Sequence, residues 1–421
     1  MSKRDLSIPT NKSPNETESI SKMEVKVVIA IFVLLVIDGI DLQMLALTLP
    51  LLMEEFNLSM LMAGTLATWT LAGMALGGIL AGWLADQIGR VKVIVMSVII
   101  FSITTTLIGF TQSYYQFAGL RFICGFGLSS LCVIGPMMAA EYIPTSNRTT
   151  ILGILQAGWS VGYVVAALLS SYFLPNYGWR IMFIMAIFPG MIGLWLMRGL
   201  ADPPSWLVAA KAKAKAKQPN EWISIWVSQD IRKTFILWSL AGIALQFGFY
   251  GANTWLPSYL AKVLNINFKN AGFYMAATYA TMILGKALSG YLADKFGRRK
   301  MWIIVGIAAA VTLPFVMHFS TPGNVVYLLP LSGLLYGAPF AINSTYMNES
   351  FPTFVRGTAV STAYNVGRVG SLLSPLFIGA VATQYSIMLG IALLGVAYAI
   401  AAIIPGLFIR EKMYDPKALI E

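Results

Sequence analysis

The chain has 421 residues, of which 57% are hydrophobic and only 11% are charged, and its mean hydropathy is +0.72. Soluble domains carry about 25% charged residues, so this composition excludes an ordinary water-soluble fold. The formal net charge is +11. Most of the basic residues lie in loops between apolar runs, which indicates contact with anionic lipid and argues against nucleic-acid binding.

Apolar runs long enough to cross a bilayer, which takes about 20 residues, recur along the whole chain. We expect twelve membrane helices, at residues 25–52, 60–84, 93–110, 116–140, 149–173, 180–199, 233–257, 269–293, 301–319, 325–348, 357–382 and 386–409. The predicted fold is therefore all-α and integral to the membrane, with two six-helix bundles. The expected domains are an N-terminal tail (1–24), a first bundle (25–200), a linker (201–232), a second bundle (233–410) and a C-terminal tail (411–421).

Basic residues are concentrated on one face of this topology. Of the 29 Lys and Arg, only Arg180, Lys262 and Lys269 lie in loops of the other face, and three more lie within spans. Because Lys and Arg favour cytoplasmic loops, both termini are expected in the cytoplasm. An even number of spans without sorting signals is typical of a bacterial inner-membrane carrier, and we expect a monomer.

A pair of motifs occurs twice in the chain at a constant offset. The segment GWLADQIGRVK (residues 82–92) returns as GYLADKFGRRK (residues 290–300), and EYIPTSNR (141–148) returns as ESFPTFVR (349–356). Each copy lies between apolar runs, so the repeating unit is half a protein of membrane helices. Two such halves that face each other form a transporter architecture.

These motifs and the twelve spans resemble the major facilitator superfamily over essentially the whole chain. The resemblance implies a conformational latch formed by Gly82, Asp86, Gly89, Arg90 and Glu141 and, in the second half, by Gly290, Asp294, Gly297, Arg298 and Glu349. Arg90 can bridge Asp86 and Glu141, while Asp86 can face the positive N-terminal end of the eleventh span. The second copy can do the same against the fifth span. The alternative is that the basic residues only set the topology.

Two carboxyl groups, Asp38 and Asp41, lie in the middle of the first span, three residues apart and so on one helical face. Ionisable groups within a membrane are costly and usually face a partner or a wet cavity, where a carboxyl can take up and release a proton. The alternative is that Gly39 breaks the helix and the acids are structural partners of basic side chains. The string DGIDLQ (residues 38–43) is similar to the aromatic acid:proton symporter branch, which includes carriers of cis,cis-muconate. This resemblance implies that both acids couple protons to transport.

Three basic residues lie within predicted spans, namely Arg121, Lys286 and Arg368. Against two acids they leave a surplus of positive charge, which suits an anionic substrate. Arg121 is expected to pair with one of the two acids and to tune its proton affinity, or to serve structure alone. Lys286 ranks below the arginines because it lies about two helical turns from Asp294 and can extend to the membrane surface.

Arg368 is the expected ligand of a substrate carboxylate. Asn365 precedes it by three residues, so an amide and a guanidinium share one helical face, and such forked donors suit a carboxylate. A structural ion pair between helices is the alternative. Further walls of the pocket are expected from polar and aromatic stripes at helical spacing, namely Gln156, Trp159, Tyr163, Gln246, Tyr250, Asn253, Asn343 and Tyr346. Such faces suit a flat, carboxylate-bearing ring, although they also occur as core packing.

The sequence thus predicts a proton-coupled symporter that imports a small organic-acid anion, either an aromatic carboxylate or cis,cis-muconate, by alternating access. Its partners are that anion, protons and the lipid bilayer. With one His and two Cys on a single predicted helix, we expect no catalytic residue, no metal, no cofactor and no enzyme activity. An organic-anion exporter, a proton-independent uniporter and a transporter-like sensor stay open as alternatives.

Overall fold

The computed structural model describes residues 22–142, 148–203 and 221–409, so the predicted tails and most of the predicted linker lie outside the described residues. Within these ranges every regular element is an α-helix. They are α1 (Lys22–Glu55), α2 (Met60–Ile88), α3 (Arg90–Ile108), α4 (Tyr114–Tyr142), α5 (Arg148–Ile184), α6 (Ile187–Met197), α8 (Glu221–Val227), α9 (Gln229–Lys262), α10 (Phe268–Phe296), α11 (Arg298–Phe319), α12 (Val325–Tyr336), α13 (Pro339–Ser350), α14 (Thr353–Gln384) and α15 (Ile387–Phe408). The predicted all-α fold is confirmed.

Two spans differ in detail from a single straight helix. The long helix α5 is interrupted at Gly178, whose backbone is not helical (φ 74°, ψ −179°), so its last turns and α6 together form the sixth span. In the second half, α12 and α13 follow each other in one apolar segment, Val325–Ser350, and form the tenth span. With these two assignments, the helices other than α8 correspond to the twelve predicted spans.

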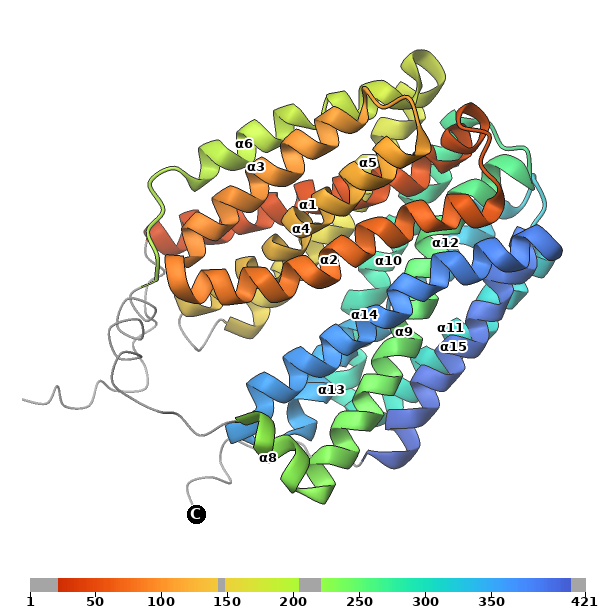
Figure 1. The fold of residues 1–421 in the computed structure, drawn as a ribbon. Helices are drawn as coiled ribbons and strands as arrows, with labels where there is room; N and C mark the ends of the chain where they lie inside the picture. Colours follow the sequence, from red (N-terminus) through yellow and green to blue (C-terminus); the bar gives the residue numbers. More distant parts are fainter. Residues whose placement is uncertain (1–21, 143–147, 204–220, 410–421) are drawn as a thin grey trace, which may run out of the picture.

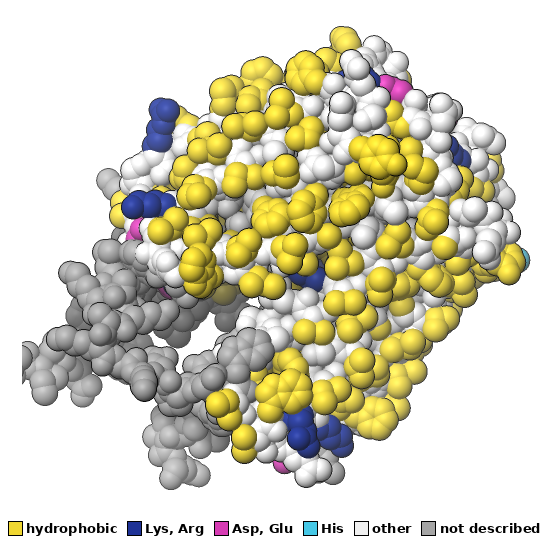
Figure 2. Space-filling model, in the orientation of Figure 1, with side chains coloured by type: hydrophobic (Ala, Val, Ile, Leu, Met, Phe, Trp, Pro, Cys, Tyr) yellow, Lys and Arg dark blue, Asp and Glu magenta, His cyan; other side chains and the backbone are white. Residues whose placement is uncertain are grey.

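The described ranges contain nine helical segments with the length and apolarity to cross a membrane. Helices α1 and α10 are also long enough, at 34 and 29 residues, and carry charged side chains in their middle. Large apolar side chains cover the outside of the molecule, as Ile79 (69% exposed) and Trp195 (65%) illustrate. Figure 2 shows this apolar surface, with basic atoms near the ends of the helices and also at the seam where the two halves meet. Such a surface suits lipid.

The helices form two bundles, α1–α6 and α9–α15, that lie side by side in Figure 1. Across the seam between them, α5 packs on α10, α2 on α14 and α1 on α9. Within the first bundle, α1 and α5 approach so closely that a Cβ atom on Gly39 would lie 2.5 Å from the carbonyl oxygen of Trp159. Gly39 therefore permits helix contact, as small residues do in membranes, and α1 is continuous through it.

The repeated glycines form the tight turns at one end of the molecule. Helix α2 passes into α3 at Gly89 (φ 107°), and α10 passes into α11 at Gly297 (φ 96°). Only glycine adopts this backbone region without strain, which explains its presence in both motif copies. We name this the motif end. In Figure 1 the two bundles diverge toward the motif end and converge toward the opposite end.

Contacts across the seam are tight at the opposite end. The Thr68 hydroxyl of α2 donates to the carbonyl oxygen of Leu372 in α14 at 3.0 Å. One turn earlier, a Cβ on Gly64 would lie only 2.4 Å from the carbonyl oxygen of Pro375. Similarly, a Cβ on Gly272 of α10 would lie 2.7 Å from the carbonyl oxygen of Ala167 in α5. The seam is therefore closed at this end.

Candidate functional site

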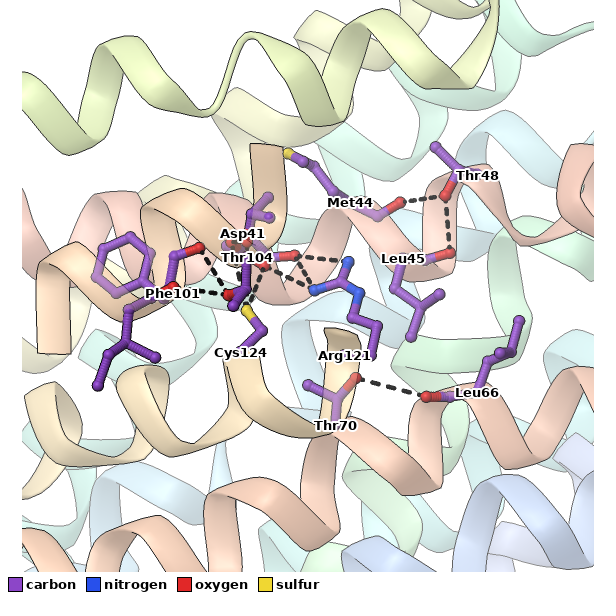
Figure 3. A network of polar contacts seen from close by, with 12 residues as sticks. Asp41, Met44, Leu45, Thr48, Leu66, Thr70, Phe101, Thr104, Arg121 and Cys124 are labelled. Carbon is purple, nitrogen blue, oxygen red and sulfur yellow. Dashed lines mark hydrogen bonds and ion pairs between the residues drawn. The ribbon is translucent and has the colours of Figure 1, made fainter. Parts of the chain in front are cut away.

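Asp41 lies at the centre of a buried polar network between α1, α3 and α4 (Figure 3). Arg121 Nη1 donates to Asp41 Oδ1 at 2.7 Å, and the Thr105 hydroxyl donates to Oδ2. The Cys124 thiol lies 3.8 Å from Oδ1. Asp41 is 2% exposed and Arg121 is fully buried. The sequence left open which acid pairs with Arg121, and the structure pairs it with Asp41.

Aromatic rings enclose the charged end of Arg121. Its guanidinium carbon lies 5.0 Å from the centre of the Phe183 ring and 6.0 Å from that of Phe117. Its Nη atoms also reach the backbone carbonyl of Asp41, at 3.4 and 3.5 Å. The aromatic rings and the carboxylate partner offset the free-energy cost of burying this cation. The pair is thus a fixed charge-neutral unit.

Asp38 has a different environment, although it lies one turn away on the same helix. The Trp159 indole donates to Oδ2, and the Cys132 thiol donates to the same oxygen at 3.0 Å. Oδ1 is buried and has no hydrogen-bond partner among the described residues. Both donors are uncharged, so Asp38 forms no ion pair with the described side chains. A buried carboxylate with one unsatisfied oxygen is suited to proton uptake.

Arg368 of α14 approaches this acid from the second bundle. Its charge acts on the Asp38 carboxyl and on the Tyr250 and Tyr364 hydroxyls. Its Nε is buried without a hydrogen-bond partner, and none of the described carboxylates forms an ion pair with it. A guanidinium and a carboxyl that belong to different bundles and form no ion pair in the described ranges can bind an anion and a proton together.

Three further hydrogen bonds cross the seam. Lys286 Nζ of α10 donates to the Ser160 hydroxyl of α5 at 2.9 Å. The Gln43 amide of α1 donates to the Tyr279 hydroxyl and, at 3.4 Å, to the carbonyl oxygen of Asn253. Lys286 therefore points into the seam, and the expectation that it extends to the membrane surface is wrong.

A small cavity of about 30 Å³ lies in the seam between α1, α2, α5 and α9. Its wall includes Gln43, Tyr163, Tyr250 and Asn253, three of which were expected in a pocket. This volume has room for about one water molecule and is too small for an organic acid.

Gln156 and Asn365 lie on the motif side of this region, and both are exposed. On α5, Gln156 shares its helical face with Ser160, which contacts the second bundle. On α14, Asn365 shares its face with Arg368, and its amide donates to the carbonyl oxygen of Ser361 at 2.9 Å. Because residues on seam-facing sides are exposed here, the seam is open at the motif end.

Three other expected pocket residues lie inside the second bundle. The Gln246 amide donates to the carbonyl oxygen of Tyr364 at 2.9 Å and so ties α9 to α14. The Tyr346 hydroxyl donates to the carbonyl oxygen of Ile409 at 2.8 Å, and its ring packs against Trp238. We therefore leave Gln246 and Tyr346 out of the proposed site. The third residue is Asn343, which is 5% exposed, and its Oδ1 has no partner in the described ranges.

The latch residues form ion pairs within each half. In the first half, Arg90 Nη2 lies 3.4 Å from Glu141 Oε1, and the side chain of Asp86 lies outside the described part. In the second half, Arg298 lies 3.1 Å from both Asp294 and Glu349. The Asp294 side chain is 72% exposed, so it does not pack on the N-terminus of α5 in this conformation. This agrees with an open motif end.

Comparison with known proteins now bears on the fold and on this site. The model of the Major Facilitator Superfamily matches residues 31–375 and 271–420. The chain belongs to the major facilitator superfamily. The family and its relatives are membrane transporters, which confirms the predicted multi-pass transporter and the prediction that the chain is no enzyme.

Individual relatives of this major facilitator chain transport organic acids according to their names. It is 46% identical over 389 residues to the cis,cis-muconate transport protein of Acinetobacter baylyi, which covers 92% of this chain and 94% of that protein. It is 26% identical over 387 residues to the benzoate transport protein of the same organism, with 84% and 82% covered. Among solved structures, a D-xylose-proton symporter aligns with a TM-score of 0.76 at 21% identity, covering 92% of this chain and 98% of that one.

Proposed function

We propose that the protein is a proton-coupled symporter that imports a small organic-acid anion, of the class of aromatic carboxylates and cis,cis-muconate, by alternating access. The observation that carries this proposal is that each bundle holds a buried group without a hydrogen-bond partner in the described ranges, Asp38 Oδ1 in the first and Arg368 Nε in the second. The 46% identity to a muconate transport protein supports the substrate class, and cis,cis-muconate is the first substrate to test.

The coupling follows from the charges at the seam. When a substrate carboxylate binds Arg368, it neutralises the positive charge that stabilises ionised Asp38. It also places a second negative charge near Asp38, and the two carboxylates repel each other. Proton uptake by Asp38 removes that repulsion, so anion and proton bind cooperatively. Asp41 does not need to take up and release a proton in each cycle, because its negative charge is paired with Arg121.

The direction of opening follows from the topology that we propose. With both termini in the cytoplasm of a bacterial inner membrane, the motif end is cytoplasmic, and the described conformation is open to the cytoplasm. Substrate and proton would leave from this state. When the motif end closes, Asp294 can reach the positive N-terminal end of α5, and a few kcal/mol of such contact suffices to shift the balance of the two states. We propose that the monomer is the transporting unit.

The experiment that tests the proposal is uptake into proteoliposomes. Labelled cis,cis-muconate, benzoate, hydroxybenzoates, protocatechuate and a sugar control are supplied with and without an inward-directed proton gradient. We expect gradient-dependent accumulation of at least one acid, which a protonophore abolishes, and no accumulation of the sugar. Accumulation that ignores the gradient would support a uniporter, and no uptake of any acid would overturn the proposal.

A further inference from the structure

We infer that Lys286 is a second carboxylate ligand of the transport site, so that the site holds a dicarboxylate with one end at Arg368 and the other at Lys286. This inference rests on the proposed function and names the substrate class within it. Lys286, which the coupling mechanism does not use, is thereby a second anion ligand beside Arg368.

Lys286 lies in a setting that leaves its charge uncompensated. It is half-buried in the middle of α10, and its Nζ has one hydrogen-bond acceptor in the described ranges, the neutral hydroxyl of Ser160 at 2.9 Å. None of the described carboxylates forms an ion pair with it. An ammonium group has three donors and is costly to bury without a negative partner. The free donors of Lys286 are therefore suited to an anionic ligand.

Neighbouring residues place Lys286 and Arg368 at one part of the seam. On α5, the Trp159 indole donates a hydrogen bond to Asp38, the acid on which the charge of Arg368 acts. The next residue, Ser160, accepts a hydrogen bond from Lys286. The same juxtaposition recurs on α9. The Nζ of Lys286 lies 5.9 Å from the centre of the Phe249 ring. Three residues earlier on α9, the Gln246 amide donates to the carbonyl oxygen of Tyr364, which lies one turn before Arg368 on α14. A ligand between the two cations thus contacts residues from both bundles.

The balance of charge at the seam favours a dianion. Arg121 and Asp41 neutralise each other within the first bundle. Lys286 and Arg368 then stand against one acid, Asp38, which leaves one positive charge when the site is empty. A monoanion brings this sum of charges to zero. A dianion overshoots by one negative charge, and one proton on Asp38 restores neutrality, so a dicarboxylate makes proton binding part of loading.

The aromatic wall beside these cations suits a flat, conjugated ligand. Trp159 and Tyr163 stack with ring centres 6.3 Å apart and planes inclined by 29°. Trp159 is half-buried. An unsaturated chain between two carboxylates can lie along such rings while its ends reach the two cations.

The test compares a diacid with its own monoester. Competition by cis,cis-muconate and by its monomethyl ester against labelled muconate is measured in proteoliposomes for the wild type, Lys286→Gln and Lys269→Gln. Lys269 is an exposed lysine on the same helix and serves as the matched control. We expect the wild type and Lys269→Gln to prefer the diacid by about tenfold or more, and Lys286→Gln to lose this preference by a similar factor.

Two further variants separate ligand contact from structural effects. Lys286→Arg keeps the positive charge and should keep the diacid preference. Ser160→Ala removes only the hydrogen bond to Lys286 and should keep the diacid preference too. If Lys286→Gln does not fold, the ratio of the affinities for muconate and for its monomethyl ester is measured by ligand-induced Trp fluorescence on Lys286→Arg and Lys286→Met. An unchanged diacid preference in Lys286→Gln or Lys286→Met overturns the inference, while the proposed function stands if the wild type accumulates acid with the proton gradient. Absence of wild-type uptake instead overturns the proposed function.

Discussion

Arg121 and Asp41 form a buried ion pair of 2.7 Å, whereas Asp38, one turn away on the same helix, is held by two uncharged donors. The two acids of the first span therefore differ in kind. Asp41 is held by a guanidinium and a hydroxyl, whereas Asp38 keeps one oxygen without a hydrogen-bond partner among the described residues. We assign the fixed charge to Asp41 and the exchanging proton to Asp38.

Replacement of Asp38 tests this division directly. An amide cannot take up and release a proton, but Arg368 and the latch are unchanged in Asp38→Asn. We expect this variant to lose proton-driven accumulation by about tenfold or more while it still exchanges internal for external substrate. The measurement is counterflow beside gradient-driven uptake in the same proteoliposomes. Accumulation at the wild-type level would show that Asp38 does not carry the proton.

Replacement of one member of the buried ion pair should cost stability. Asp41→Asn leaves the Arg121 charge without its partner, and breaking a buried pair in this way costs about 3–5 kcal/mol. The double variant Asp41→Asn, Arg121→Gln removes both charges and should recover much of the loss. Apparent melting temperatures of the purified proteins give the answer. A double variant as unstable as the sum of the two single variants would contradict a direct pairing.

The motif glycines should differ in their tolerance of a side chain. Gly89 has φ 107°, a region in which other residues pay about 1–3 kcal/mol, and a Cβ there would lie 2.3 Å from Asp202 Oδ2. By contrast, a Cβ on Gly82 would meet nothing within 4 Å. We expect Gly89→Ala to lower the melting temperature and Gly82→Ala to leave it unchanged. Equal effects of both substitutions would indicate that backbone strain is not the reason for Gly89.

Labelling of single cysteines can show which end of the seam is open. Gln156→Cys and Asn365→Cys, in a Cys132→Ser background, should react with an impermeant maleimide from the motif end. Leu45→Cys is the buried control, at 4% exposure for the native side chain, and should react slowly. Reaction of the first two from the opposite end alone would contradict the described conformation.

The fold was predictable because membrane helices have a strong signal in sequence. Length, apolarity and the repeated GWLADQIGRVK motif were enough to predict twelve spans in two halves. The two departures are predicted spans that the structure divides: residues 180–199 are divided between the end of α5 and α6, and residues 325–348 between α12 and α13. Apolar runs alone do not show such changes of direction.

The site was predictable only where charges lie in the membrane. Asp38, Asp41, Arg121 and Arg368 stood out because intramembrane charges are rare, and the choice of Asp41 as the partner of Arg121 required the packing of α1 on α4. No role in the site was predictable for Thr105, Cys124, Cys132 and Ser160, because a single polar residue in an apolar helix is common.

Helical spacing was the weakest guide. Gln246 and Tyr346 belong to polar-aromatic stripes, yet both bond to backbone carbonyls inside the second bundle. The distance of Lys286 from Asp294 suggested a surface position, whereas α5 offers it the hydroxyl of Ser160 across the seam. Which neighbour a side chain meets depends on how the two bundles face each other, and periodicity within one helix carries no information on this.

The most direct test of proton-coupled anion transport is a recording of proton movement caused by the substrate itself. Proteoliposomes with a trapped pH-sensitive dye and no imposed gradient are given external cis,cis-muconate. We predict acidification of the lumen that depends on muconate, is absent with a sugar, and is lost in Asp38→Asn. Entry of labelled muconate without any acidification would contradict symport and the role of Asp38.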